Sequence, residues 1–134
     1  MKTLIEEDST PPVLLLVNRD VMSGIAIANA AKAVGLRFQR VASVEFLMDR
    51  VSAPTDRIAL VVLDMNVAID WDVVSQLTAN AGSPPVIGFG PHVDIEGRRR
   101  AKSAGLTRIF SNSEFHKKME IIRRYAEPGP IEPE

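Results

Sequence analysis

Continuous apolar runs alternate along this chain with segments whose apolar residues recur every three or four positions. Val13–Val17 and Ile58–Leu63 are unbroken apolar runs, typical of strands that are covered on both faces. Three further segments are expected to form strands, although polar residues interrupt two of them: Leu36–Ala42, Val86–Phe89 and Leu106–Phe110. The pattern therefore predicts five short strands.

The segments between these runs have the apolar spacing of helices. The first predicted helix spans about Val21 to Val34, and Gly35 follows as its left-handed C-terminal cap. Its inward stripe is expected to hold Ile25, Ala28, Ala31 and Val34. Further helices are predicted at Ser43–Val51, which Pro54 stops, and at Asp70–Ala79, Asp94–Ala104 and Ser113–Tyr125. The last of these is expected to turn Phe115, Met119 and Ile122 inward.

Strict alternation of strands and helices predicts an α/β fold, a doubly wound parallel sheet with helices on both faces. For a chain of this size the flavodoxin-like strand order 2-1-3-4-5 follows by analogy, with binding at the carboxyl ends of the strands. We expect one domain over residues 13–126, with flexible tails at 1–12 and 127–134. The residues expected at the binding edge are Asn18, Arg19, Asp20, Asp64, Gly90 and Asn112.

The composition of the chain excludes several kinds of functional site. The chain has 134 residues, a formal net charge of −1 and no cysteine, which excludes disulfides, thiolate metal sites and cysteine nucleophiles. No apolar run approaches the roughly 20 residues that span a bilayer, and the start turns acidic too soon for a signal peptide. We therefore expect a cytoplasmic protein without a membrane partner.

The sequence offers little support for an enzyme. It has no Gly-rich phosphate loop, no nucleophile and base at a recognisable spacing, and no cluster of metal ligands. His92 and His116 stand 24 positions apart without acidic partners, so neither is expected to bind a metal. Trp71 is interpreted as covering the edge of the core, with a role as a partner anchor as the alternative.

Three segments carry a family resemblance. They are Leu60–Met65 (LVVLDM), Pro85–Gly90 (PVIGFG) and Ala101–Phe110 (AKSAGLTRIF), in this order and spacing. With the strand at Val13–Val17, they resemble the receiver domain of two-component response regulators, the CheY-like domains, over about residues 13 to 126. The resemblance implies a signalling domain in which Asp64 is the phospho-accepting aspartate.

The other residues that the resemblance assigns to phosphorylation are changed. The family has an acidic pair for magnesium after the first strand, whereas this chain has Asn18 and Arg19. The phosphoryl-binding Ser or Thr corresponds to Gly90, and the Lys-Pro pair after the fifth strand corresponds to Asn112 and Ser113. Only Asp64 is retained, with Asp20 one position beyond the usual acidic pair.

These changes predict a stand-alone pseudo-receiver, with phosphorylation weak or absent and no cofactor. Magnesium prefers carboxylate, water and phosphate oxygens, and Arg19 supplies the opposite charge. A contact between Arg19 and Asp64 would compete with a metal and keep the aspartate ionised. The alternative is a phosphorylatable response regulator that receives phosphate from a histidine kinase at Asp64, using Mg²⁺ held by Asp20 and Asp64.

Basic residues concentrate near the end of the chain. In receivers, the face formed by the fourth helix, fifth strand and fifth helix commonly binds partners. The resemblance thus implies a protein-binding face here, or a weak homodimer through it. Nucleic acid ranks low as a partner, because the net charge is not basic and no recognition module is attached. The residues assigned to this face are Arg98, Arg99, Arg100, Lys102, Lys117 and Lys118.

Overall fold

The computed structural model describes residues 10–52, 56–80 and 82–126. The expected tail at 127–134, most of the tail at 1–12 and the helix stop at Pro54 lie outside these residues. The described chain contains five strands, which are β1 (Val13–Val17), β2 (Arg37–Val41), β3 (Ile58–Asp64), β4 (Val86–Gly90) and β5 (Arg108–Ser111). All five strand predictions are confirmed, with ends that differ by at most two residues.

The strands form one parallel sheet in the order β2-β1-β3-β4-β5, as the sequence predicted. The two longest apolar runs, β1 and β3, occupy the interior of the sheet, which explains why nearly every residue in them is buried. β2 and β5 are the edge strands. Their more polar sequences agree with exposure along one side.

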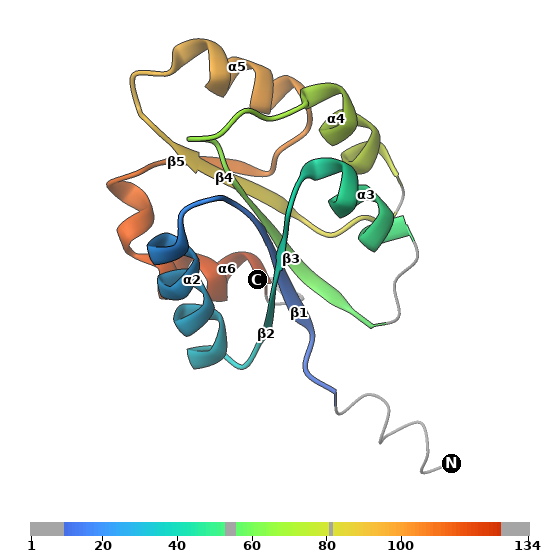
Figure 1. Ribbon diagram of the computed structural model, residues 1–134, viewed down its shortest axis with the longest axis vertical. Helices are drawn as coiled ribbons and strands as arrows, with labels where there is room; N and C mark the ends of the chain where they lie inside the picture. Colours follow the sequence, from blue (N-terminus) through green and yellow to red (C-terminus); the bar gives the residue numbers. More distant parts are fainter. Residues whose placement is uncertain (1–9, 53–55, 81, 127–134) are drawn as a thin grey trace, which may run out of the picture.

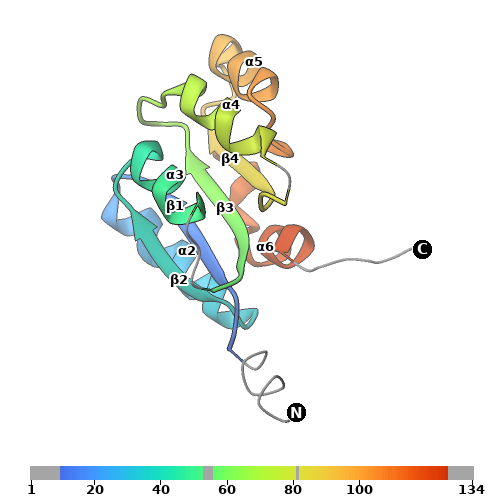
Figure 2. The same ribbon diagram turned by 90° about the vertical axis from the view of Figure 1, so that its right-hand side faces the viewer.

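Helices cover both faces of the sheet (Figures 1 and 2). One face packs against α3 (Val44–Ser52), α4 (Trp71–Ala79) and α5 (Ile95–Ser103). The other packs against α2 (Val21–Ala33) and α6 (Lys118–Ala126), and the 3-10 turn η1 (Glu114–His116) lies between β5 and α6. Alternate residues of β1 and β3 enter the two cores, because successive side chains of a strand point to opposite faces. None of the helices in the described ranges is both long and apolar enough to cross a bilayer.

Helix α2 corrects one prediction. Its buried residues are Gly24, Ile27, Ala30 and Ala31, whereas Ile25 is 51% exposed. The helix has apolar residues on several sides, so its sequence permits more than one inward stripe. In the structure Ile27, Ala30 and Ala31 pack into the core and Gly24 lies beside Asn18, which decides between them. The cap at Gly35 is confirmed, with φ +88°.

The last predicted helix is also corrected, because it is two elements. Lys117 has φ −85° and ψ 49°, which are not helical values, so it separates η1 from α6. Phe115 and Ile122 are buried as predicted, but Met119 is exposed. The break changes the helical phase after Phe115, and this turns Met119 outward.

Asp56, just before β3, links strand β2 to helix α3. Its carboxylate accepts hydrogen bonds from Arg37 of β2 and from Arg50 of α3, the latter at 2.9 Å. The hydrogen bond from Arg37 is the main cause that lowers the pKa of Asp56, and partial burial opposes it. The folded state therefore favours the ionised carboxylate more than the unfolded state does.

We predict a pH-dependent contribution of Asp56 to stability. Since its folded pKa is lowered, the contribution is present above the unfolded pKa of about 4 and is lost as pH falls through the folded pKa. Asp56→Asn should cost about 0.5–1 kcal/mol at pH 7, the upper part of the range for partly exposed pairs, and should flatten the acid decline. Urea unfolding at pH 7, 4 and 3 measures it. Glu96→Gln is the control and should change little, because its ion pairs with Arg99 and Arg100 are more than half exposed; equal effects of both substitutions would contradict the prediction.

Candidate functional site

The carboxyl ends of four strands bring together four of the residues that the sequence singled out. Asn18 follows β1, Asp64 ends β3, Gly90 ends β4 and Asn112 follows β5. These ends lie at one edge of the sheet because the strands are parallel. Asn18 is 2% exposed and Asp64 is 3% exposed. Both polar groups therefore depend on partners within the protein.

Asn18 is bound on both sides of its amide. Its Nδ2 donates to the carbonyl of Asp20 at 2.7 Å and to the hydroxyl of Ser23 at 3.2 Å. Its Oδ1 accepts from Nε of Arg40 at 2.8 Å, and Nη2 of Arg40 donates to the Asn18 carbonyl at 3.1 Å. A guanidinium from the neighbouring strand β2 is thereby fixed at the end of β1. Sequence reasoning missed Arg40.

The contact between Arg19 and Asp64, which the sequence left open, is not among the ion pairs of the described residues. The four ion pairs found in the described ranges join Arg37 and Arg50 to Asp56, and Arg99 and Arg100 to Glu96. Arg19 instead lines a cleft of about 420 Å³ together with Glu45 and Asp70. The chain turns after buried Asn18, so the next side chain faces outward. The cation bound at the end of β1 is Arg40.

Asp20 caps the N-terminus of helix α2. Its Oδ1 accepts from the amide of Met22 and its Oδ2 from the amide of Ser23, both at 3.2 Å. This is N-terminal capping of α2, which satisfies amides that have no partner within the helix. Both carboxylate oxygens of Asp20 are therefore engaged.

Asp64 lies at one end of a short network of amides. Its Oδ1 accepts from the backbone amide of Asn66 at 2.9 Å and from Nδ2 of Asn66 at 2.7 Å. Asn66 and Asn112 then form a reciprocal amide pair, with hydrogen bonds of 3.1 and 3.2 Å. The orientation is consistent, because a carboxylate can only accept and must face the donor end of Asn66. Asn112 thus reaches Asp64 through Asn66, a residue that sequence reasoning did not select.

Gly90 and Gly88 make room for Met65, the residue after Asp64. A Cβ atom on Gly90 would lie 2.9 Å from Cβ of Met65, and one on Gly88 would lie 2.8 Å from its Sδ. The buried Met65 side chain therefore occupies the space beside β4 that larger residues would fill. Of the two interpretations of these glycines, tight packing accounts for them without a ligand.

Two of the side chains that would face a magnesium ion at this edge are engaged with other partners. Magnesium requires oxygen ligands in near-octahedral geometry, usually with one or two carboxylates. Here the amide of Asn18 holds a guanidinium, and Asp20 caps a helix. Across the described segments, no group of three or more His, Asp or Glu residues could hold a metal ion. The geometry thus gives no support to the shell of Asp20 and Asp64.

The sequence also singled out Trp71, His116 and His92. Trp71 begins α4 and packs, half-buried, against the core on that face. Nδ1 of His116 lies 2.5 Å from the carbonyl of Ser113. His92 lies beside α5, far along the chain from His116 and outside any metal-binding group in the described residues.

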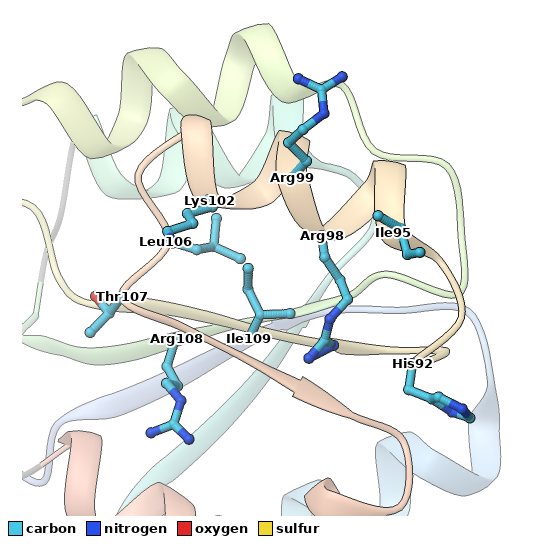
Figure 3. A pocket seen from close by; sticks show the side chains of 9 residues that line it. All are labelled: His92, Ile95, Arg98, Arg99, Lys102, Leu106, Thr107, Arg108 and Ile109. Atoms are coloured by element: carbon cyan, nitrogen blue, oxygen red, sulfur yellow. The ribbon is translucent and has the colours of Figure 1, made fainter.

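A basic groove lies between α5 and β5, with a volume of about 620 Å³ (Figure 3). Arg98 extends from α5 down toward β5, beside Ile109, whereas Arg99 points away from the strand. Arg108 points from β5 away from α5 and toward α6, where its Nη1 donates to the Tyr125 hydroxyl at 3.1 Å. The floor and walls are partly apolar, and the lining residues are His92, Ile95, Arg98, Arg99, Lys102, Leu106, Thr107, Arg108 and Ile109.

The six basic residues assigned to a partner face are not equivalent in the structure. Arg98, Arg99 and Lys102 line the α5–β5 groove, while Arg100 lines a depression on the α4 side of α5. Lys117 lies in another depression beside α6, and the Lys118 ammonium is 5.8 Å from the centre of the Phe115 ring. The helices called fourth and fifth in the sequence are α5 and α6. The basic residues therefore occupy several surfaces around β5.

No protein-family model matches the sequence, and no curated protein matches it either. Solved structures do match. The response regulator receiver protein from Burkholderia phymatum is 25% identical, with a TM-score of 0.64 over 88% of this chain and 99% of that chain. The receiver domain of a sensor histidine kinase from Pseudomonas aeruginosa, solved with a coordinated magnesium ion, is 15% identical, with a TM-score of 0.71 over 87% and 98%.

A third similar structure is the phosphorylated cyanobacterial phytochrome response regulator RcpA. It is 14% identical, with a TM-score of 0.70, over 90% of this chain and 98% of that one. The matches extend over nearly the whole of each receiver and agree with the strand order 2-1-3-4-5. They confirm the resemblance stated from the sequence: the chain has the fold of a response regulator receiver domain.

Proposed function

We propose that this chain, which has the receiver fold, is a pseudo-receiver that signals by binding another protein, with phosphorylation of Asp64 weak or absent. The observation that carries the proposal is the amide network on Asp64. Asn66 donates two hydrogen bonds to one carboxylate oxygen and is itself paired with Asn112. Both donors are neutral amides that fix the Oδ1 side of the carboxylate.

Charge around the site supports the same proposal. A phosphorylated aspartate carries several negative oxygens, which metal ions and fixed donors stabilise in phosphoryl transfer. Gly90 supplies no hydroxyl and Asn112 no amine, and the fixed cation Arg40 is bound to Asn18. The edge thus holds Oδ1 of Asp64 with neutral amides and lacks the hydroxyl and the amine that would stabilise the product.

A beryllofluoride titration tests this proposal. With Mg²⁺ present, beryllofluoride should leave the amide resonances of Asn66, Gly90 and Asn112 unshifted, because no metal shell is available to hold it on Asp64. Two-dimensional amide NMR is the measurement, with Asp64→Asn as the control for nonspecific effects. Saturable shifts centred on Asp64 that vanish in Asp64→Asn would instead establish the alternative, a phosphorylatable response regulator.

One observation favours that alternative. Asp64 is buried at the end of a central strand and forms no ion pair within the described residues, so no cation competes for it directly. A histidine kinase would then be the partner that supplies phosphate. The fixed donors around Asn18 and Asp64 weigh more heavily, and we keep the pseudo-receiver as the conclusion.

The proposed partner face comprises α5, β5 and α6. Three surface depressions meet at Arg108, which lines all of them, and each has at least one further basic residue, although Glu120 lines two of them and Glu114 one. β5 is an edge strand, so this side of the sheet is not covered by a further strand. These features support a protein-binding role for the face. A weak homodimer is the other candidate occupant.

A further inference from the structure

A cleft of about 420 Å³ opens between the three loops that follow β1, β2 and β3. The loop after β1 leads to α2 on one face of the sheet, and the loop after β3 leads to α4 on the other. The cleft therefore lies where the chain changes the face on which it winds, and open α/β sheets bind ligands at such points. Its volume lies within the range of about 300–1,000 Å³ found for small-molecule sites.

The cleft is separate from the amide network around the candidate phosphoacceptor. Neither Asp64 nor its partner Asn66 is among the described residues that line it. Asn18 does line it, but the side-chain amide of Asn18 is already bound to Arg40. A ligand in the cleft would thus meet side chains that neither the resemblance nor the network around Asp64 explains.

Opposite charges line the cleft without pairing. Arg19 belongs to the loop after β1, Glu45 lies in the first turn of α3, and Asp70 caps α4. None of the ion pairs found in the described ranges joins any two of these three side chains. The backbone amides that Asp70 caps donate to its Oδ1, which leaves Oδ2 for another donor. A molecule with both an anionic and a cationic group matches this arrangement.

Apolar side chains complete the lining. Val67 and Ile69, on the loop after β3, are half-buried, and Val17 and Val44 are buried. An aliphatic group placed on Val67 and Ile69 would gain from leaving water. A metal ion or a phosphate would match only one sign of charge and would leave this apolar surface hydrated. The lining therefore favours a small molecule that is zwitterionic at one end and aliphatic at the other.

We propose that this cleft binds an aliphatic α-amino acid, with its carboxylate on Arg19, its ammonium on Glu45 and Asp70, and its side chain on Val67 and Ile69. A guanidinium can donate to both oxygens of a carboxylate, which fixes the orientation of the ligand. The proposal goes beyond the function proposed above, because it gives the domain a small-molecule ligand at a site away from the partner face.

A panel of free amino acids tests the binding. Leucine, isoleucine and valine should each raise the melting temperature as their concentration increases, because a ligand that binds only the folded state stabilises it by mass action. Isothermal titration calorimetry gives the Kd of each. Glycine should bind at least about tenfold more weakly than leucine, since it lacks the aliphatic group. Absence of binding by all three aliphatic amino acids, or equal affinities for leucine and glycine, would overturn the proposal.

Two analogues of leucine test the assigned contacts. Leucinamide lacks the carboxylate, and 4-methylpentanoate lacks the ammonium. Arg19→Gln should weaken leucine by about tenfold and leave leucinamide unchanged, because the partner of Arg19 is already missing from leucinamide. Glu45→Gln should likewise weaken leucine and leave 4-methylpentanoate unchanged. If Arg19→Gln weakened leucine and leucinamide equally, the carboxylate would not lie on Arg19, and the proposed site would be wrong.

Matched substitutions outside the cleft control for net charge. Arg124→Gln and Glu120→Gln remove the same charges from exposed positions on α6, and both should leave the affinity for leucine unchanged. Losses equal to those of Arg19→Gln and Glu45→Gln would overturn the proposal. Amide shifts on addition of leucine should centre on the loops around Val67, and shifts centred on α5 and β5 would also contradict it. The beryllofluoride result does not depend on leucine, so failure here leaves the pseudo-receiver proposal standing.

Discussion

Replacing Phe115 with alanine is expected to lower the free energy of unfolding by about 3–5 kcal/mol, the usual cost of removing a large buried aromatic side chain. Phe115 is 2% exposed, and its ring stacks on Phe89 with centroids 4.5 Å apart. It also contacts the ring of Phe110 at 5.9 Å. The residue therefore fastens η1 to β4 and β5, next to the loop that carries Asn112. Urea unfolding, monitored by circular dichroism, measures the loss.

Two controls accompany this substitution. Phe115→Leu retains most of the volume and should lose clearly less, which keeps the comparison measurable if Phe115→Ala does not fold. Phe46→Ala removes the same side chain from a site that is 61% exposed, so it should change stability by at most about 0.5 kcal/mol. A similar effect of Phe46→Ala and Phe115→Ala would show that the aromatic cluster does not hold η1 in place.

Adding a methyl group to Gly88 or Gly90 is expected to cost about 1–3 kcal/mol at either position, because both substitutions overpack the space beside Met65. The atoms in the way differ. At Gly88 they are the Sδ of Met65 and the Cδ2 of Leu106, which are side-chain ends. At Gly90 the nearest atoms are the Cβ and the backbone of Met65. Alanine at position 65 would remove the Met65 sulfur from the Gly88 site, where Cδ2 of Leu106 would remain, and would keep the Cβ and backbone that obstruct Gly90.

A double-mutant cycle distinguishes the two glycines. Met65→Ala should recover about 1 kcal/mol of the cost of Gly88→Ala, within the usual range for contacting residues. It should leave the cost of Gly90→Ala unchanged within about 0.5 kcal/mol, as expected without coupling. Urea unfolding of the four single and double variants and of Met65→Ala supplies the free energies. Recovery at both positions would show that the Met65 backbone moves freely, and that a hydroxyl at position 90 could be accommodated.

Much of the candidate site could be predicted from the sequence because its residues lie at the ends of strands. The run Ile58–Leu63 marks a central strand, and the residue after a buried run must leave the core at the sheet edge. This reasoning located Asp64, Asn18 and Gly90 without knowledge of their partners. It could not supply those partners, since Arg40 and Asn112 come from other segments of the chain and the local contact of Asn66 depends on side-chain direction.

Two of the missed residues had weak signals. Arg40 lies one position before the end of β2, which is the neighbour of β1, and so a long basic side chain there can reach the end of β1. Asn66 follows Asp64 by two residues, the spacing at which a carboxylate commonly accepts a local backbone amide. Neither signal distinguishes a partner from a solvated side chain. The contact of Arg19 with Asp64 stayed open for the same reason, because the place of Arg19 next to Asn18 in the sequence does not fix the direction of its side chain.

The sequence by itself indicated the parallel sheet and the place of Asp64, since apolar periodicity and the right-handed crossover rule act on local pattern and chain connectivity, while the strand order followed by analogy. The tertiary structure alone decided that Arg40 binds Asn18 and that Asn66 joins Asn112 to Asp64. Hydrogen bonds of this kind depend on distances of about 3 Å between segments far apart in the chain, and such distances arise only when the helices and strands have packed.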